Sequence, residues 1–167
     1  MKIKAFTLVE VMIVIALLGI LAAVILPTMY GHTISARESA VKDCLMTMRT
    51  QIQLYKMEHN GIPPGYVNGI GVSSLMLEPQ LTGTTAVTGQ ASTNKVPTAL
   101  FPYGPYIKRL PENPFNHRKD ISYVNVATAF ADAVDGTTCG WLYKRETAEF
   151  VINLTGKDSK GAYFYDY

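Results

Sequence analysis

An apolar segment near the start of the chain constrains this protein more than any other feature. Residues 6–26 contain one ionisable side chain, Glu10, in an otherwise apolar or small run. A helix needs about 20 apolar residues to cross a membrane, so the segment predicts a transmembrane helix. Lys2 and Lys4 precede it, and the positive-inside rule then places them in the cytoplasm and the remainder of the chain outside.

Two simpler interpretations of this segment leave Glu10 unexplained. A cleaved secretory signal or a plain one-pass anchor would not carry a carboxylate inside its apolar run. An unpaired charge in hydrocarbon costs a few kcal/mol, so Glu10 needs a cationic partner. No Lys, Arg or His lies between Phe6 and Tyr30. If the chain were cut before Phe6, the new amino group would lie about one helical turn from Glu10, on the same copy or on a neighbour.

The residues Lys4–Glu10 (KAFTLVE) resemble the class III signal of type IV pilins and type II secretion pseudopilins. The resemblance implies a leader of residues 1–5, cleavage by prepilin peptidase between Ala5 and Phe6, and N-methylation of Phe6. It also implies that Glu10 aids subunit assembly. Ala5 is a departure, because the family usually has glycine before the cut.

The apolar helix is expected to continue into a second, amphipathic half. Pro27 removes a backbone donor, and with Gly31 it predicts a kink. Beyond them, apolar residues recur at helical spacing and predict a buried stripe: Val41, Leu45, Met48, Ile52 and Tyr55. A stop signal follows at residues 59–64. One long bent helix over residues 6–59, about 80 Å in length, is therefore predicted.

The C-terminal part predicts a small sheet. Residues 122–126, 140–144 and 149–154 alternate β-branched or aromatic residues with polar ones, whereas residues 82–94 are typical of an exposed loop. The segments GPYIKRLPENPFN and GWLYKRETAEFVINLTG resemble the C-terminal region of major-pseudopilin-like proteins. The expected fold class is α+β, a pilin fold with a long kinked N-terminal helix on a small antiparallel sheet. Its expected parts are a leader (1–5), a transmembrane and filament-core helix (6–29) and a globular head (30–167).

Catalytic and metal signatures are missing from the sequence. No zinc-ligand, Walker or nucleophile motif occurs, so neither an enzyme nor a metal site is assigned. Calcium remains open through Asp132, Asp135 and Asp158, three oxygen donors in loop-like sequence. A disulfide between Cys44 and Cys139 also stays open, because the spacing does not reveal their proximity. The net charge of +2 and the isolated basic pairs, such as Lys108–Arg109, do not indicate nucleic-acid binding.

The resemblance implies a structural function. The chain is expected to reside in the inner membrane with its head outside the cytoplasm, and then to polymerise into a periplasmic or surface filament. Its expected partners are further copies of itself, prepilin peptidase, the inner-membrane assembly platform, minor pseudopilins or pilins, and lipid before assembly. A major pseudopilin of type II secretion is the preferred interpretation, and a type IV pilin of a surface pilus is the alternative.

Overall fold

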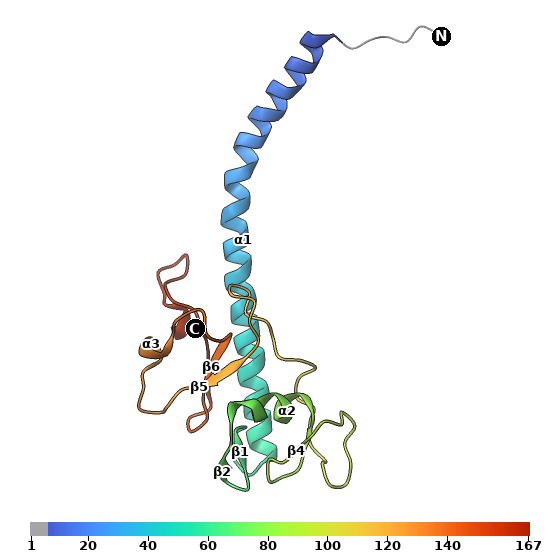
Figure 1. The fold of residues 1–167 in the computed structure, drawn as a ribbon, viewed down its shortest axis with the longest axis vertical. Helices are drawn as coiled ribbons and strands as arrows, with labels where there is room; N and C mark the ends of the chain where they lie inside the picture. The colour runs from blue at the N-terminus through green and yellow to red at the C-terminus, as the bar shows by residue number, and fades with distance from the viewer. Residues whose placement is uncertain (1–6) are drawn as a thin grey trace, which may run out of the picture. The chain divides into compact units, whose positions relative to one another are not determined.

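The computed structural model describes the backbone of residues 7–167 and the side chains of residues 7–23 and 33–167 (Figure 1). The chain forms two compact units, residues 1–37 and 38–167. One helix, α1, covers Leu8–Glu58 and contributes to both. Its bounds include Pro27 and Gly31, so neither residue ends the helix, and the kink expected there stays a prediction.

Between Leu8 and Leu21, α1 carries apolar side chains on every side, and Glu10 is the one charged residue among them. Its large aliphatic side chains between Leu8 and Leu21 are all at least half exposed in the isolated chain. A helix that is apolar all round is stable only when lipid or other protein covers it. Among the described residues, no helix is both long and apolar enough to span a membrane. The predicted span, residues 6–29, extends at both ends beyond the described side chains of residues 7–23.

In the head, α1 presents the predicted stripe to the core. Val41, Leu45, Met48, Ile52 and Tyr55 are all buried, which confirms the interpretation of the helical spacing. The helix ends at Glu58 and turns sharply at the next residues, where Asn60 and Gly61 adopt positive φ angles of 55° and 82°. Asparagine and glycine tolerate this left-handed conformation best, which explains why the helix stops here.

Three strands form the main sheet, in the order β5–β6–β7. They are β5 (Ile121–Tyr123), β6 (Trp141–Lys144) and β7 (Glu149–Ile152). β6 pairs antiparallel with β7, as expected, but β5 pairs parallel with β6. Residues 124–140, which include α3 (Phe130–Ala133), supply the long crossover that a parallel pair requires.

The sheet packs on α1 through one hydrophobic core. Trp141, Tyr143, Phe150 and Ile152 are buried in the same cluster as the α1 stripe. The long helix and the small sheet confirm the α+β class of a pilin fold.

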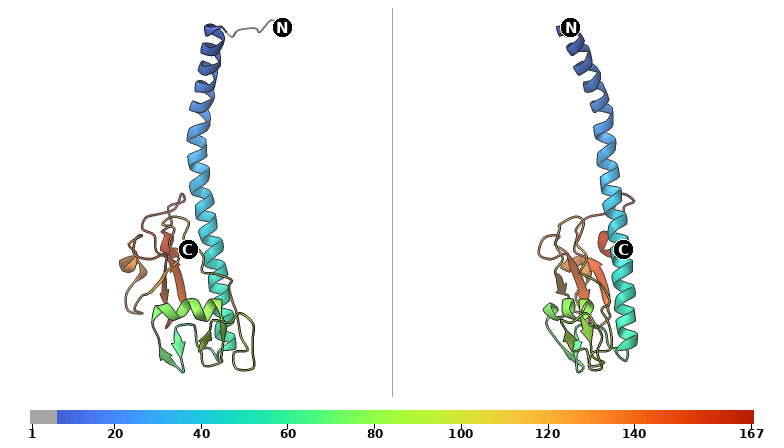
Figure 2. Two further views of the ribbon diagram at one scale, coloured as in Figure 1. Left: turned by 45° about the vertical axis from the view of Figure 1, so that its right-hand side comes forward. Right: turned by 90° about the vertical axis from the view of Figure 1, so that its right-hand side faces the viewer.

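Short elements gather at the C-terminal end of α1 (Figure 2). They are β1 (Tyr66–Val67), β2 (Ile70–Gly71), the 3-10 helix η1 (Ser74–Met76), α2 (Leu77–Thr82), β3 (Thr84–Thr85) and β4 (Ala91–Ser92). The expected exposed loop at residues 82–94 is wrong in part, because Thr84 and Thr85 are fully buried. Their backbone N–H groups donate to the carbonyl oxygens of Asn94 (2.9 Å) and Tyr103 (2.8 Å), and this pairing lets polar residues enter the core.

One buried side chain joins these short elements. The amide of Gln80 accepts a hydrogen bond from Gly65 N (2.7 Å) and donates to the carbonyl oxygens of Tyr66 (2.9 Å) and Gly89 (2.7 Å). A two-residue strand has little stability of its own. Gln80 therefore holds both hairpins against α2.

The C-terminal segment is held against the head by polar and aromatic contacts. Phe164, in the 3-10 helix η2 (Phe164–Asp166), is buried in the main core. Glu38 on α1 accepts hydrogen bonds from the backbone N–H (2.8 Å) and the hydroxyl (2.7 Å) of Ser159. Asp158 lies 3.8 Å from Lys42 Nζ. The tail therefore covers the sheet beside α1.

Candidate functional site

Glu10 belongs to a capping box at the start of α1. Thr7 precedes the first helical residue, and its hydroxyl accepts a hydrogen bond from Glu10 N (3.2 Å). In return, Glu10 Oε2 accepts from Thr7 N (3.0 Å) and from the Thr7 hydroxyl (3.0 Å). This reciprocal arrangement satisfies two of the N–H groups that every helix leaves unpaired at its N-terminus.

The capping box orients the carboxylate for a second partner. Both hydrogen bonds from Thr7 end on Oε2, and within the described residues Oε1 has no hydrogen-bond partner. The positive end of the helix dipole also favours a negative charge at this position. Glu10 can therefore hold its own helix terminus and present an oxygen to a cation from elsewhere.

The sequence itself contains a signal for this cap. Thr7 and Glu10 have the spacing S/T-x-x-E, which marks a helix N-terminus. The only partner predicted for Glu10 was the amino group of Phe6. Ala5 and Phe6, the expected cleavage and methylation residues, lie outside the described residues, and their roles stay predictions.

The two cysteines are free thiols in the structure. Cys44 is half-buried on α1 and packs against the main core. Cys139 is fully buried in a separate cluster with Val124, Leu142 and Val151.

Of the three aspartates considered as calcium ligands, two accept hydrogen bonds from other residues of the head and the third is exposed. Asp135 accepts hydrogen bonds from the N–H groups of Thr138 and Thr137, which hold its pKa well below the usual value. Asp158 accepts from the Tyr167 hydroxyl (2.8 Å), the main cause of its lowered pKa. Asp132 lies exposed on α3. Over the described part of the chain, no group of three or more His, Cys, Asp or Glu residues could hold a metal ion.

Comparison with known proteins shows which family the chain resembles. Residues 1–26 match the family described as the prokaryotic N-terminal methylation motif. The chain is 30% identical over 114 residues to type II secretion system core protein G of Aeromonas hydrophila, covering 68% of each protein. It is 29% identical over 113 residues to the protein of that name in Pectobacterium carotovorum subsp. carotovorum, covering 67% of this chain.

A third relative has a different name. Prepilin peptidase-dependent protein D of Escherichia coli (strain K12) is 32% identical over 113 residues, covering 60% of this chain and 73% of the relative. No solved structure matches the chain. The chain spans 62% of the length of the Pectobacterium protein. From the N-terminal motif and the identity to the Aeromonas protein, the chain belongs to the family of type II secretion system core protein G, the major pseudopilins.

Proposed function

We propose that this chain is the major structural subunit of a type II secretion pseudopilus. The proposal rests on two features that occur together at the start of α1, an exposed apolar surface and a carboxylate in a capping box. A helix segment with exposed apolar side chains on every side carries one carboxylate, and a capping box holds that carboxylate at the helix terminus. In a filament, the same apolar surface passes from lipid to neighbouring helices and is never exposed to water.

Assembly follows from the charge of Glu10. Prepilin peptidase cuts between Ala5 and Phe6, and the new amino group of Phe6 is methylated and remains cationic. Glu10 of one copy then pairs with the Phe6 amino group of a neighbour, which removes two unpaired charges from an apolar environment. This pairing also fixes the axial register between neighbouring helices.

The remaining partners follow from this role. The subunit waits in the inner membrane with its head outside the cytoplasm, and it is incorporated by the inner-membrane assembly platform together with minor pseudopilins. No enzymatic activity is assigned to it. A type IV pilin of a surface pilus is the alternative, and relatives named for type II secretion do not favour it.

The test is the N-terminal residue of the protein purified from native membranes, determined by mass spectrometry. The expected result is a chain that begins at methylated Phe6. An intact Met1, or a cut within residues 22–31, would contradict the proposal, because Glu10 would then lack the partner that assembly requires.

A further inference from the structure

A short loop of the C-terminal segment, residues 156–163, lies against the start of the head's part of α1. A β-bridge between Lys157 and Tyr163 closes the loop. Ser159, near its tip, donates two hydrogen bonds to the carboxylate of Glu38, the first residue of the head unit. The loop is therefore held at the end of the head from which α1 continues into the N-terminal unit.

The carboxylates of this region are turned inward. Glu38 and Asp158 are 6% and 8% exposed. Asp158 accepts hydrogen bonds from the backbone N–H groups of Lys160 (2.9 Å) and Ala162 (2.8 Å). The side chains of Lys157 and Lys160, in contrast, are exposed. The outer face of the loop is therefore positively charged.

An exposed tyrosine accompanies these cations. Tyr163 is 41% exposed and stacks on Tyr165, with the two ring centroids 5.0 Å apart. The Nζ atom of Lys157 lies over the Tyr163 ring, 4.5 Å from its centroid. Tyrosine is enriched at membrane–water interfaces, where its ring lies among the headgroups, and lysine is attracted to anionic lipid. The loop thus combines the two kinds of side chain that suit a lipid surface.

The length of α1 brings this loop close to such a surface. The expected span ends at residue 29, and Glu38 follows about 14 Å further along the helix, at 1.5 Å per residue. The headgroup layer on one side of a bilayer occupies about 5–8 Å of this length. The distance that remains is about one Debye length at physiological salt. Exposed lysines beside Glu38 therefore interact with the charge of anionic headgroups.

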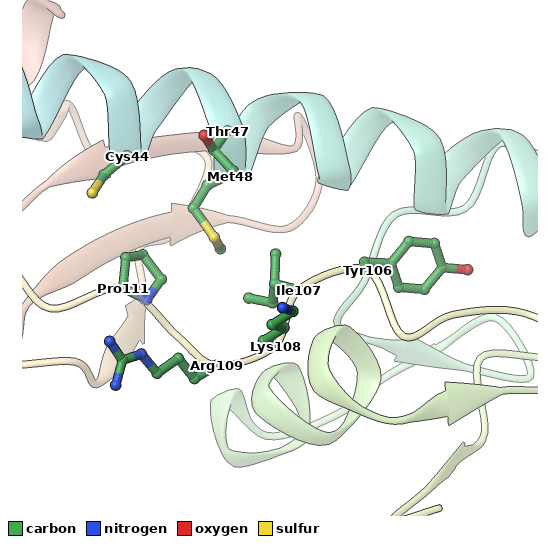
Figure 3. A pocket seen from close by; sticks show the side chains of 8 residues that line it. All are labelled: Cys44, Thr47, Met48, Tyr106, Ile107, Lys108, Arg109 and Pro111. Atoms are coloured by element: carbon green, nitrogen blue, oxygen red, sulfur yellow. The ribbon is translucent and has the colours of Figure 1, made fainter. Parts of the chain in front are cut away.

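Another exposed basic pair has different surroundings. Lys108 and Arg109 border a mostly apolar groove of about 330 Å³ between α1 and residues 106–111 (Figure 3). The helix wall of this groove, residues 44–48, lies about 9–15 Å beyond Glu38 along α1, at 1.5 Å per residue. That is a further Debye length or more at physiological salt. The pair therefore offers a comparison of equal charge at a greater distance from the expected span.

We propose that residues 156–163 rest on the headgroups of anionic phospholipids while the subunit waits in the membrane. In this contact the ammonium groups of Lys157 and Lys160 pair with lipid phosphates, and Tyr163 lies among the headgroups. The proposal rests on the proposed function, because only a membrane-embedded N-terminal helix brings the loop to a lipid surface. Incorporation into a filament withdraws the helix from lipid, so the contact belongs to the unassembled subunit.

The test measures how close the loop lies to lipid in full-length subunits reconstituted into vesicles. Ala162→Cys carries a fluorescent label in a Cys44→Ser background, because Cys139 is fully buried. Lipids with a nitroxide on the headgroup quench a fluorophore at the bilayer surface. Quenching is expected to rise with the share of phosphatidylglycerol in phosphatidylcholine vesicles. It is expected to fall at about 1 M salt, where the Debye length shrinks to about 3 Å.

Matched variants of the labelled protein show which charges are responsible. Lys157→Glu with Lys160→Glu is expected to lower the equilibrium constant for lipid contact about 30-fold or more, since each cation near an anionic surface contributes about fivefold. Lys108→Glu with Arg109→Glu changes the net charge equally and is expected to lower it less than about threefold. Lys157→Arg with Lys160→Arg keeps both charges and is expected to quench like the parent. A label at Ile70→Cys, exposed on β2, is expected to give no quenching.

The outcomes separate this contact from the proposed function. Equal quenching at residue 162 with and without phosphatidylglycerol would overturn the lipid contact and leave the proposed function standing. An unchanged signal after reversal of Lys157 and Lys160, or an equal loss after reversal of Lys108 and Arg109, would also overturn it, because the charge of the loop would then not determine the contact. Failure of the full chain to float with vesicles of either composition would overturn both, because the proposed function requires a subunit embedded in the membrane.

Discussion

The capping role of Glu10 and its proposed pairing with a neighbouring subunit can be separated by substitutions at the capping box. Glu10→Gln keeps a side chain that can accept from Thr7 N, because glutamine also completes a capping box, but it removes the charge. Thr7→Ala removes the hydrogen bond from the residue-10 N–H to the Thr7 hydroxyl and keeps the charge. Glu10→Ala removes the charge and the return hydrogen bonds to Oε2, but its backbone N–H can still donate to Thr7. The three variants therefore distinguish helix capping from pairing with a neighbouring subunit.

The expected magnitudes differ enough to be measured. Loss of the hydrogen bond from Glu10 N to the Thr7 hydroxyl costs about 0.5–2 kcal/mol, or about 2- to 30-fold in an equilibrium constant. Loss of the Glu10 charge leaves a neighbour's amino group unpaired among apolar helices. This costs about 2.5–3.5 kcal/mol, or about 60- to 300-fold. Glu10→Gln is therefore expected to impair assembly more than Thr7→Ala.

The assay is the fraction of processed subunits that sediments as sheared filaments, at matched subunit levels in the membrane. The expected order of assembly is wild type, Thr7→Ala, Glu10→Gln and Glu10→Ala. If Glu10→Gln assembled like wild type while Thr7→Ala and Glu10→Ala failed equally, the charge pairing would be refuted and the cap alone would explain the need for Glu10 in assembly.

Three further predictions concern the head. Burial lowers the pKa of His59 below 6.5, so the folded head binds the imidazole proton less readily than the unfolded chain. The head therefore loses stability as the pH falls below about 6.5. Between pH 7 and 5, the thermal unfolding temperature should vary less in His59→Gln than in the wild type. Trp141→Phe removes the indole donor to Pro111 O (2.9 Å) and is expected to cost about 1–3 kcal/mol in denaturant unfolding; an unchanged midpoint would contradict this. Glu38→Ala removes both hydrogen bonds from Ser159 and is expected to cost about 1.5–3 kcal/mol, with faster proteolysis of residues 156–162 than in Ser39→Ala.

Local patterns in the sequence predicted the helical part of this fold. The stripe from Val41 to Tyr55 and the stop after Glu58 depend on residues close together in the chain, and the structure confirms both. The strands predicted at 140–144 and 149–154 are observed at 141–144 and 149–152, and they form a hairpin whose residues are neighbours in sequence.

Features that depend on distant residues were missed or left open. The parallel pairing of β5 with β6 depends on a crossover through residues 124–140, whose path no local pattern specifies. The burial of Thr85 depends on backbone pairing with Tyr103, a partner that periodicity does not reveal. The capping box of Thr7 and Glu10 is local, however, and its S/T-x-x-E spacing is readable from the sequence, although the only partner predicted for Glu10 was a cation.

The three hydrogen bonds of Gln80 have a consequence for how this end of the head can vary. All three connect to backbone atoms, of Gly65, Tyr66 and Gly89, and none depends on the side chain of a loop residue. Loops anchored in this way can exchange exposed residues such as Ile70 or Val87 while their backbone path stays the same. The exposed surface at this end of the head can thus change without loss of the three hydrogen bonds of Gln80.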